Sequence, residues 1–386
     1  MKKQSLPQYS AFLLALSVFG VTGCNNDVEP KENLRPSIDY TKITATTPYS
    51  SLFVDQNGAS TVDLTSGNAR INMFRAWDAY AKKVTVAGAT APLDASVLKN
   101  MYANTGNPFT GDYASLNSSG LQLRSVTAVS ATDPEKERKL MDDAMVMLAT
   151  TSQSVAATAE EGKAGKLGSY LVDAQGIEWG QVIAKSLIGA YQLDYIGNVL
   201  LNEGLKADNY SLVAGKPYTQ LEHNWDEAYA NFTLKPIYAG DATATSNGGE
   251  TFLGAYVWEY NKEGYPKMHQ AFLKGRAAIV NNDVTTYQEQ ARIIRTEMEK
   301  AVANSSIGYL KKTRENATDP ARRAHAYSEG LGFIYSLRYA KLAGADAAFS
   351  DAILNSLGYT KDGMWKVKND QIEQAIKTIS TKFGIN

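Results

Sequence analysis

Apolar side chains recur at three- and four-residue spacings along most of the chain, which is the pattern of amphipathic helices. The first clear stripe follows Asn68 and consists of Met73, Phe74, Trp77, Tyr80 and Ala81. The same spacing predicts later helices at residues 133–157, 177–201, 217–232, 266–281, 285–312, 320–342 and 370–383. Few segments alternate with the period of two that is typical of strands. The pattern therefore predicts an all-α fold, either one elongated helical bundle or two packed bundles.

Local signals support individual helices and separate them. Asp133, Pro134 and Glu135 form a strong helix start, because Asp caps free amide groups, Pro suits the first turn and acids suit the positive end of a helix. Residues 177–201 are apolar nearly all round, which predicts a helix at the centre of the fold. Polar, glycine-rich stretches predict connections at 85–120, 162–168 and 240–249, and a break between two bundles is expected near 205–215 or 240–250.

The N-terminus has the pattern of a bacterial lipoprotein signal peptide. Lys2 and Lys3 precede a short apolar run at 11–21, and a small residue stands just before Cys24. The run is too short for a transmembrane helix, which needs about 20 apolar residues. We expect cleavage after residue 23 and lipidation of Cys24, the only cysteine of the sequence. This places the protein in the cell envelope on an acyl anchor.

The residues after the lipidation site predict a flexible tether and the membrane to which the protein is sorted. Residues 24–48 are polar, contain three prolines and lack periodicity, so they predict a flexible tether to a helical domain at 49–386. Asn25 and Asn26 follow the lipidated cysteine. In enterobacteria an aspartate there would signal retention in the inner membrane, so its absence favours the outer membrane.

Composition and motifs exclude several functional classes. Without residues 1–23 the chain keeps 37 basic and 40 acidic side chains, because Lys2 and Lys3 are the only charges lost. That balance provides no basic surface for nucleic acid. The sequence contains no Gly-x-Ser-x-Gly, His-Glu-x-x-His or Cys-x-x-Cys motif, and the Gly/Lys loop at 162–168 lacks the spacing of a phosphate-binding loop. The familiar kinds of hydrolytic site are therefore unsupported.

Two histidines share one local arrangement that suits a metal ion. Glu227 follows His223 by four residues, and Glu329 follows His325 by four, so each pair lies on one helix face. If the two faces meet, two imidazoles and two carboxylates could hold one divalent ion, such as iron or zinc. The side of the second helix that carries His325 continues through small residues, which favours close approach by another element. Buried polar groups without a metal are the alternative.

Four further carboxylates are candidates for a ligand-binding site between helices. Asp194 shares its helix face with apolar residues, so it must find a donor or shift its pKa upward, and Glu178 begins the same predicted helix. Glu222 and Asp226 stand beside His223. Structural hydrogen bonds are the alternative for each of them.

Several segments resemble a family of Bacteroidetes lipoproteins that carry domain of unknown function 4856. The resemblance runs from about Tyr49 to the C-terminus, and its most specific element is LEHNWDEAY at 221–229; the others lie at 176–179, 186–194 and 325–337. The chain resembles imelysin-like proteins more distantly, which implies a helical, extracytoplasmic protein associated with iron acquisition. It departs from their Gly-x-His-x-x-Glu motif, because Leu221 stands in place of the glycine and Asp226 in place of the glutamate.

These observations lead to three hypotheses of function. The first is a non-enzymatic, lipid-anchored envelope protein that binds a metal or iron species, or a partner such as an outer-membrane receptor of an iron-uptake system. The second is a metal-dependent hydrolase that uses His223, Glu227, His325 and Glu329. The third is a structural adaptor of an outer-membrane complex.

Overall fold

The computed structural model describes residues 34–44, 47–233, 250–359 and 361–385. Within these ranges the chain forms packed helices and one small hairpin, so the predicted all-α fold is confirmed. Residues Asn33–Asn386 form one compact unit, with no division near 205–215. The other expected break falls mainly on 234–249, which lie outside the described residues. None of the helices in the described ranges is both long and apolar enough to cross a membrane.

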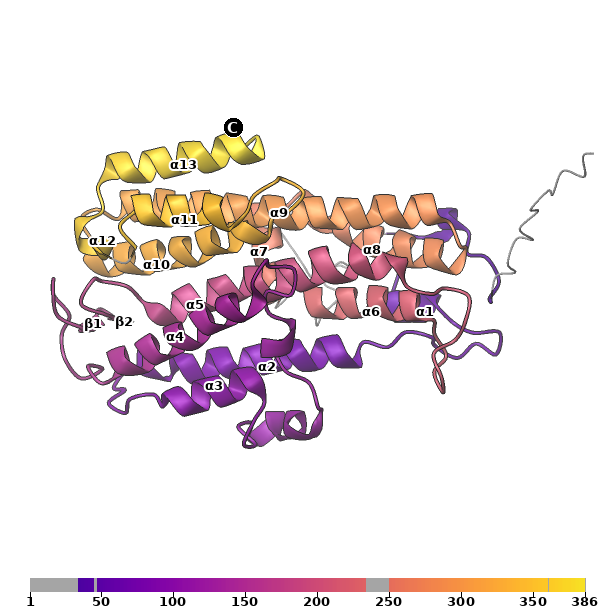
Figure 1. Ribbon diagram of the computed structural model, residues 1–386, viewed down its shortest axis with the longest axis horizontal. Coiled ribbons are helices and arrows are strands. Elements are labelled where there is room, and N and C mark those ends of the chain that lie inside the picture. Colours follow the sequence, from indigo (N-terminus) through magenta and orange to yellow (C-terminus); the bar gives the residue numbers. More distant parts are fainter. Residues whose placement is uncertain (1–33, 45–46, 234–249, 360, 386) are drawn as a thin grey trace, which may run out of the picture. The chain divides into compact units, whose positions relative to one another are not determined.

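The α-helices and strands have the following bounds (Figure 1). They are α1 (Tyr49–Leu52), α2 (Thr65–Ala81), α3 (Ala95–Ala103), α4 (Pro134–Ser152), β1 (Gly165–Leu167), β2 (Tyr170–Val172), α5 (Trp179–Leu187), α6 (Gln220–Phe232), α7 (Phe252–Tyr260), α8 (Gly264–Val280), α9 (Val284–Glu315), α10 (Pro320–Ser336), α11 (Ala347–Ser356), α12 (Gly363–Lys366) and α13 (Asn369–Phe383). A π-helix, η5 (Ile188–Leu200), continues α5. Short 3-10 helices include η1 (Tyr40–Lys42), η6 (Glu203–Lys206) and η8 (Leu337–Tyr339).

Caps set several helix starts. The Asp133 side chain accepts from the amide of Lys136, and Pro134 occupies the first turn of α4, as the sequence predicts. Helix α4 ends at Ser152, five residues before the predicted end. Thr219 and Glu222 form a capping box that starts α6 at Gln220, three residues after the predicted start.

The predicted central helix at 177–201 is buried as expected, but it changes its winding along its length. After Leu187 the α-helix becomes the π-helix η5, in which nearly every residue is buried. A π-helix of this length is rare. The hydrophobic pattern of this segment fits the 3.6-residue period of an α-helix, so it does not predict the wider turn of a π-helix.

Helix α9 is the longest element, and α7, α8, α10 and α13 pack against it (Figure 1). Helix α5 lies against α10 and α4, and α2 lies against α6. The small-residue side of α10 meets α5, as the sequence predicts: a Cβ at Gly332 would stand 2.6 Å from the Cβ of Lys185, and the Ser336 hydroxyl donates to the Lys185 carbonyl at 2.7 Å. The Gly/Lys loop pairs into the antiparallel hairpin β1–β2, with Lys166 opposite Leu171.

The predicted flexible tether is wrong for the part of it that the structure describes. Arg35 is buried and forms an ion pair with Glu222. The backbone of Ile38 exchanges two hydrogen bonds with the side chain of Asn281, at 2.7 and 2.9 Å. The Tyr40 hydroxyl donates to Asp283 at 3.0 Å. We call residues 34–44 the strap, since they are bonded along α6, α8 and the start of α9.

Candidate functional site

The two His–Glu pairs lie in different regions of the unit. The ring of His325 stacks on Tyr170 of β2, with centroids 4.3 Å apart. His223 lies on α6 and stacks on Tyr218, with centroids 4.8 Å apart. The β1–β2 hairpin and α6 lie at opposite ends of the helical unit (Figure 1). The structure therefore does not bring the two histidines together.

The predicted metal centre is corrected by the partners of its residues. Across the described ranges, no group of three or more His, Cys, Asp or Glu side chains is arranged to hold a metal ion. His223, Glu227, His325 and Glu329 each have internal partners instead. The helical spacing correctly paired each His with its Glu, but it carried no information on which faces of distant helices meet.

His325 lies between two carboxylates. Its Nδ1 is 2.7 Å from Oε2 of Glu178, and its Nε2 is 3.4 Å from Oε2 of Glu329. Because the two ring nitrogens point to opposite sides, these carboxylates cannot share one ion with the ring. Lys185 Nζ completes the group at 2.9 Å from Oε1 of Glu329. The four side chains join α5 to α10, and we call them the His325 cluster.

The His325 cluster is a network of opposite charges. Burial alone would lower the pKa of His325, but the hydrogen bond and charge of Glu178, together with the charge of Glu329, raise it above its usual range. Burial favours a higher pKa for Glu329, yet the charges of Lys185 and His325 bring it below its usual range. Both ring nitrogens are occupied, so His325 offers no free nitrogen to act as a base or a metal ligand.

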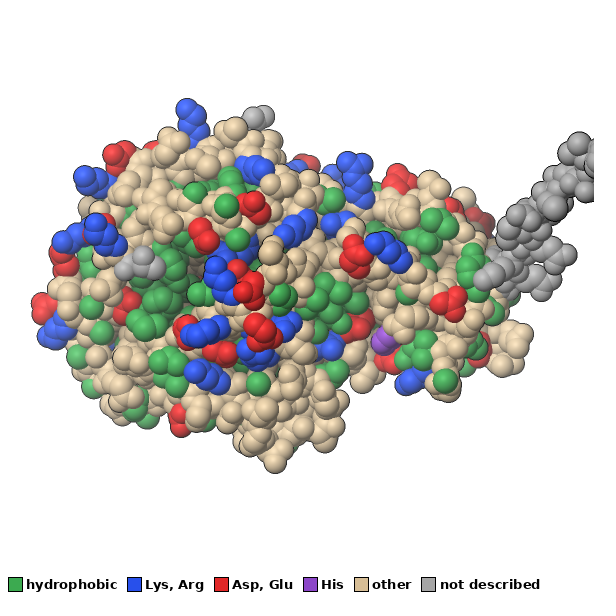
Figure 2. Space-filling view, in the orientation of Figure 1, with side chains coloured by type: hydrophobic (Ala, Val, Ile, Leu, Met, Phe, Trp, Pro, Cys, Tyr) green, Lys and Arg blue, Asp and Glu red, His purple; other side chains and the backbone are tan. Residues whose placement is uncertain are grey.

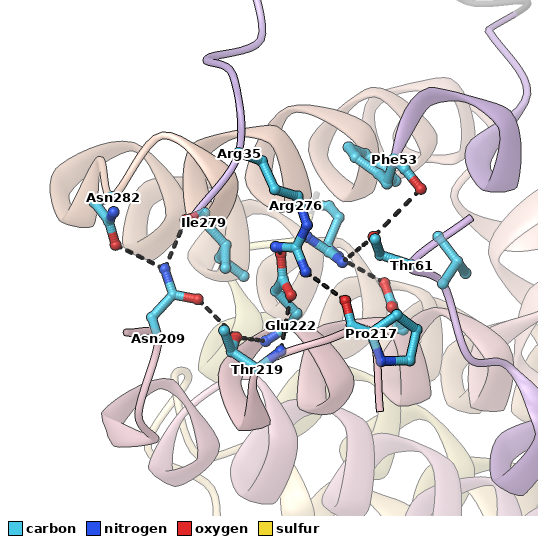
Figure 3. A network of polar contacts seen from close by, with 12 residues as sticks. Arg35, Phe53, Thr61, Asn209, Pro217, Thr219, Glu222, Arg276, Ile279 and Asn282 are labelled. Atoms are coloured by element: carbon cyan, nitrogen blue, oxygen red, sulfur yellow. Dashed lines mark hydrogen bonds and ion pairs between the residues drawn. The ribbon is translucent and has the colours of Figure 1, made fainter. Parts of the chain in front are cut away.

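The second cluster neutralises two of the predicted ligand-binding residues. Arg276 of α8 donates from Nη1 to Glu222 at 2.9 Å (Figure 3). Its Nε donates to Asp226 at 2.8 Å. Arg35 of the strap also pairs with Glu222, and the Tyr49 hydroxyl donates to Asp226 at 2.8 Å. We call these residues the Arg276 cluster. Burial raises the pKa of Asp226 although Arg276 lies beside it.

The remaining predicted residues also have internal partners. Glu227 pairs with Arg70 of α2, and its other oxygen lies 3.9 Å from Nε2 of His223. Asp194 accepts from the amide of Ser130 at 3.0 Å and from Asn198 at 2.9 Å, and burial raises its pKa. The expectation that Asp194 finds donors and shifts its pKa upward is therefore confirmed. The open ligand-binding role of Glu178, Asp194, Glu222 and Asp226 is not seen, because each has hydrogen-bond or ion-pair partners within the protein. Among the described residues, Oδ2 of Asp226 is buried without a partner.

A pocket that the sequence did not reveal opens between α4, α5, η8 and α11. It has a volume of about 440 Å³. Its apolar walls include Leu140, Met141, Met147, Val182, Ile183 and Leu354, and Trp179, Tyr335 and Tyr359 add aromatic surface. Figure 2 shows hydrophobic side chains gathered on the surface between α4 and α11. The available signal was the pair Leu140 and Met147, seven residues apart on an otherwise polar side of α4, each 41% exposed.

The polar groups of this pocket are few. Arg338 contributes to the lining, and its guanidinium already pairs with Glu137 at 2.9 Å and Asp351 at 2.5 Å. The buried Ser186 also contributes to the lining. The rim carries opposite charges at Lys136 and Asp143. The pocket therefore presents apolar surface, few polar groups and no excess charge.

The described residues form an all-α fold built around a buried π-helix, and they contain the His325 cluster, the Arg276 cluster and the apolar pocket between α4, α5, η8 and α11. A family model matches residues 49–386, described as Domain of unknown function (DUF4856), and the chain belongs to that family. The match covers α6, α10 and every wall of the pocket. Neither the curated proteins nor the solved structures contain a match to this chain.

Proposed function

We propose that this protein is a lipid-anchored binding protein of the cell envelope that holds a small, neutral, largely apolar ligand. The anchor is inferred from the sequence pattern at residues 1–24, which lie outside the described residues. The ligand is inferred from the pocket between α4, α5, η8 and α11. Its volume of about 440 Å³ falls in the range of about 300–1,000 Å³ that small-molecule sites occupy.

The exposed apolar walls are the observation that carries this proposal. Leu140 and Met147 keep much of their surface in water, at 41% each, although α4 could have placed polar residues there. Each Å² of such surface that a ligand covers contributes about 25 cal/mol. Arg338 is neutralised by Glu137 and Asp351, so the site favours a neutral ligand over an anion.

The metal functions have weaker support than the pocket. Iron or zinc binding and metal-dependent hydrolysis both need free carboxylates as ligands. In the His325 and Arg276 clusters, lysine and arginine side chains already neutralise those carboxylates. A partnership with an outer-membrane receptor system, or a role as adaptor, is compatible with the proposed anchor. No contact among the described residues favours either over ligand binding.

A neutral fluorescent probe, N-phenyl-1-naphthylamine, tests the pocket. We expect its emission to rise on binding to the wild type. Ala144→Phe should abolish the rise, because Ala144 lines the pocket and the added ring fills it. Lys139→Phe is the matched control, since Lys139 lies on the same helix with its side chain 71% exposed and is not part of the lining.

A second variant guards against misfolding of the first. Met147→Asp places a charge on an exposed wall position, so it should fold normally and weaken the binding of the probe. Circular dichroism and thermal unfolding would check each variant. Equal binding of the probe by the wild type, Ala144→Phe and Met147→Asp, or no binding by the wild type, would refute the proposed site.

A further inference from the structure

The strap fixes the position at which the N-terminal segment joins the helical unit. Arg35 pairs with Glu222 and also donates to the carbonyl of Pro217 at 2.5 Å (Figure 3). Ile38 and Tyr40 are bonded to Asn281 and Asp283, between α8 and α9. The described chain therefore begins beside the start of α6 and the end of α8, which we call the strapped end.

The strap also shortens the reach of an N-terminal anchor. A tether that was free up to residue 48 could extend over about 86 Å at about 3.6 Å per residue. Only residues 25–34 lie between Cys24 and the first strap contact, and these ten residues span at most about 36 Å. Helix α9 has 32 residues and is therefore about 48 Å long at 1.5 Å per residue. An anchor at Cys24 thus limits the distance of the strapped end from the membrane to about 36 Å, which is less than the length of α9.

Large apolar side chains are exposed at this same end. Leu34, Tyr210, Leu212 and Val284 are 45%, 42%, 51% and 46% exposed. Leu34 is the first residue of the strap, and Val284 is the first residue of α9. The loop that carries Tyr210 and Leu212 is fixed here by Asn209, which donates to the carbonyl of Ile279 at 2.7 Å and to Asn282 at 2.8 Å (Figure 3). All four therefore belong to the strap, to the start of α9, or to the loop that is hydrogen-bonded to the end of α8.

We infer that the strapped end docks on the lipid surface that carries the anchor, with Leu34, Tyr210, Leu212 and Val284 entering the interface between headgroups and acyl chains. Tyrosine and aliphatic side chains are suited to that interface, since it accepts an apolar body beside a polar tip. A few such side chains are enough for stable docking, because the lipid anchor keeps them at a high effective concentration near the membrane surface. Asp208 and Lys216 in the same loop have opposite charges, so docking should not depend on anionic lipid. The inference rests on the lipid anchor of the proposed function.

Site-specific quenching in vesicles tests the orientation. The lipidated full chain is reconstituted into phosphatidylcholine vesicles whose acyl chains carry bromine, with a bimane label at Leu212→Cys or at Lys163→Cys. Lipidation occupies Cys24, so each variant has one free thiol. Lys163 precedes β1 at the other end of the unit, and its side chain is 59% exposed. We expect a loss of fluorescence at the Leu212 position, none at the Lys163 position, and no change at high salt.

The outcomes separate the docking surface from the anchor. Unquenched labels at both positions on protein that floats with the vesicles would overturn the docking surface and leave the anchor intact. Equal quenching at both positions would overturn the orientation. Protein that neither floats nor incorporates palmitate would overturn the anchor, and the inference with it. As a further check, Tyr210→Ser with Leu212→Ser should reduce the quenching of a label at Val284→Cys while the protein still floats.

Discussion

Removal of Arg276 should cost far more stability than the loss of a surface arginine. Its side chain is fully buried and faces two carboxylates that are also fully buried, at 2.9 Å from Glu222 and 2.8 Å from Asp226. Arg276→Met fills most of the same space but leaves those charges without their shared partner. Breaking a buried ion pair in this way costs about 3–5 kcal/mol.

The two carboxylates should not contribute equally to that loss. Glu222 keeps Arg35 and the Thr219 amide as partners. Asp226 keeps only the hydroxyl of Tyr49 among the contacts described above. We therefore expect Asp226→Asn to recover much of the stability in the Arg276→Met background, and Glu222→Gln to recover less. A double-mutant cycle measures this difference directly.

The loss should also depend on pH in a defined direction. Burial already raises the pKa of Asp226 with Arg276 present. Without the arginine, that pKa rises further above its value in the unfolded chain. A carboxyl group with a raised folded-state pKa destabilises the fold above its unfolded pKa, and the penalty is relieved as the pH falls toward the folded value. The deficit of Arg276→Met should be larger at pH 8 than at pH 5.5.

Urea unfolding followed by circular dichroism at the two pH values provides the measurement. Arg322→Met is the matched control, because that side chain is 74% exposed and its pair with Asp319 lies on the surface. Such pairs contribute about 0–1 kcal/mol. A cost below about 1 kcal/mol for Arg276→Met, or a deficit that neither pH nor Asp226→Asn reduces, would refute the reasoning.

Three shorter predictions concern other parts of the chain. His325→Gln should lower the thermal midpoint more at pH 6 than at pH 9. The raised pKa of His325 stabilises the fold below the unfolded-state pKa of about 6.5, and this contribution is lost as the pH rises through the folded-state pKa. An equal loss at both pH values would contradict the prediction. Gly275→Ala should destabilise the protein by about 1–3 kcal/mol, because the new Cβ would stand 2.0 Å from Cζ2 of Trp225. In the control Gly180→Ala in α5, the new Cβ meets nothing nearer than 4.0 Å, so this variant should be neutral or stabilising. Urea unfolding measures both. Cys24→Ala should release the protein from the membrane fraction and abolish palmitate incorporation; membrane-bound, palmitate-labelled variant protein would exclude Cys24 as the lipidation site.

Most of the longer helices could be predicted because each depends on neighbours in sequence, whereas the shorter helices α3, α7 and α11 were not predicted. The Asp133 cap, the apolar stripe of α2 and the small-residue side of α10 are all local patterns, and the structure contains them. The partners of the polar residues could not be predicted in the same way. Arg276 is 54 residues from Glu222, and Glu178 is 147 residues from His325. A spacing of four residues shows that two side chains share a face, but it does not show what that face meets.

The pocket escaped prediction for a related reason. Its walls come from helices that are far apart in the sequence, and each wall residue alone has the pattern of ordinary core or surface. Tyr335 and Val182, for example, fit their helix stripes as core residues. On α4, Leu140 and Met147 are exposed apolar residues of the pocket, but Val146 is also exposed, and single exposed apolar residues are common on protein surfaces.

The segment LEHNWDEAY, which carries the most specific resemblance, has a structural explanation for most of its residues. Leu221 is buried in the core, Glu222 caps α6 and pairs with Arg276, and Trp225 packs against Gly275. Asp226 and Glu227 neutralise Arg276 and Arg70. A segment with these tasks specifies how α6 joins α2 and α8, so its resemblance to a family indicates a shared fold more directly than a shared chemistry. The function is therefore better sought in the α4–α11 pocket, where Leu140 and Met147 leave apolar surface exposed.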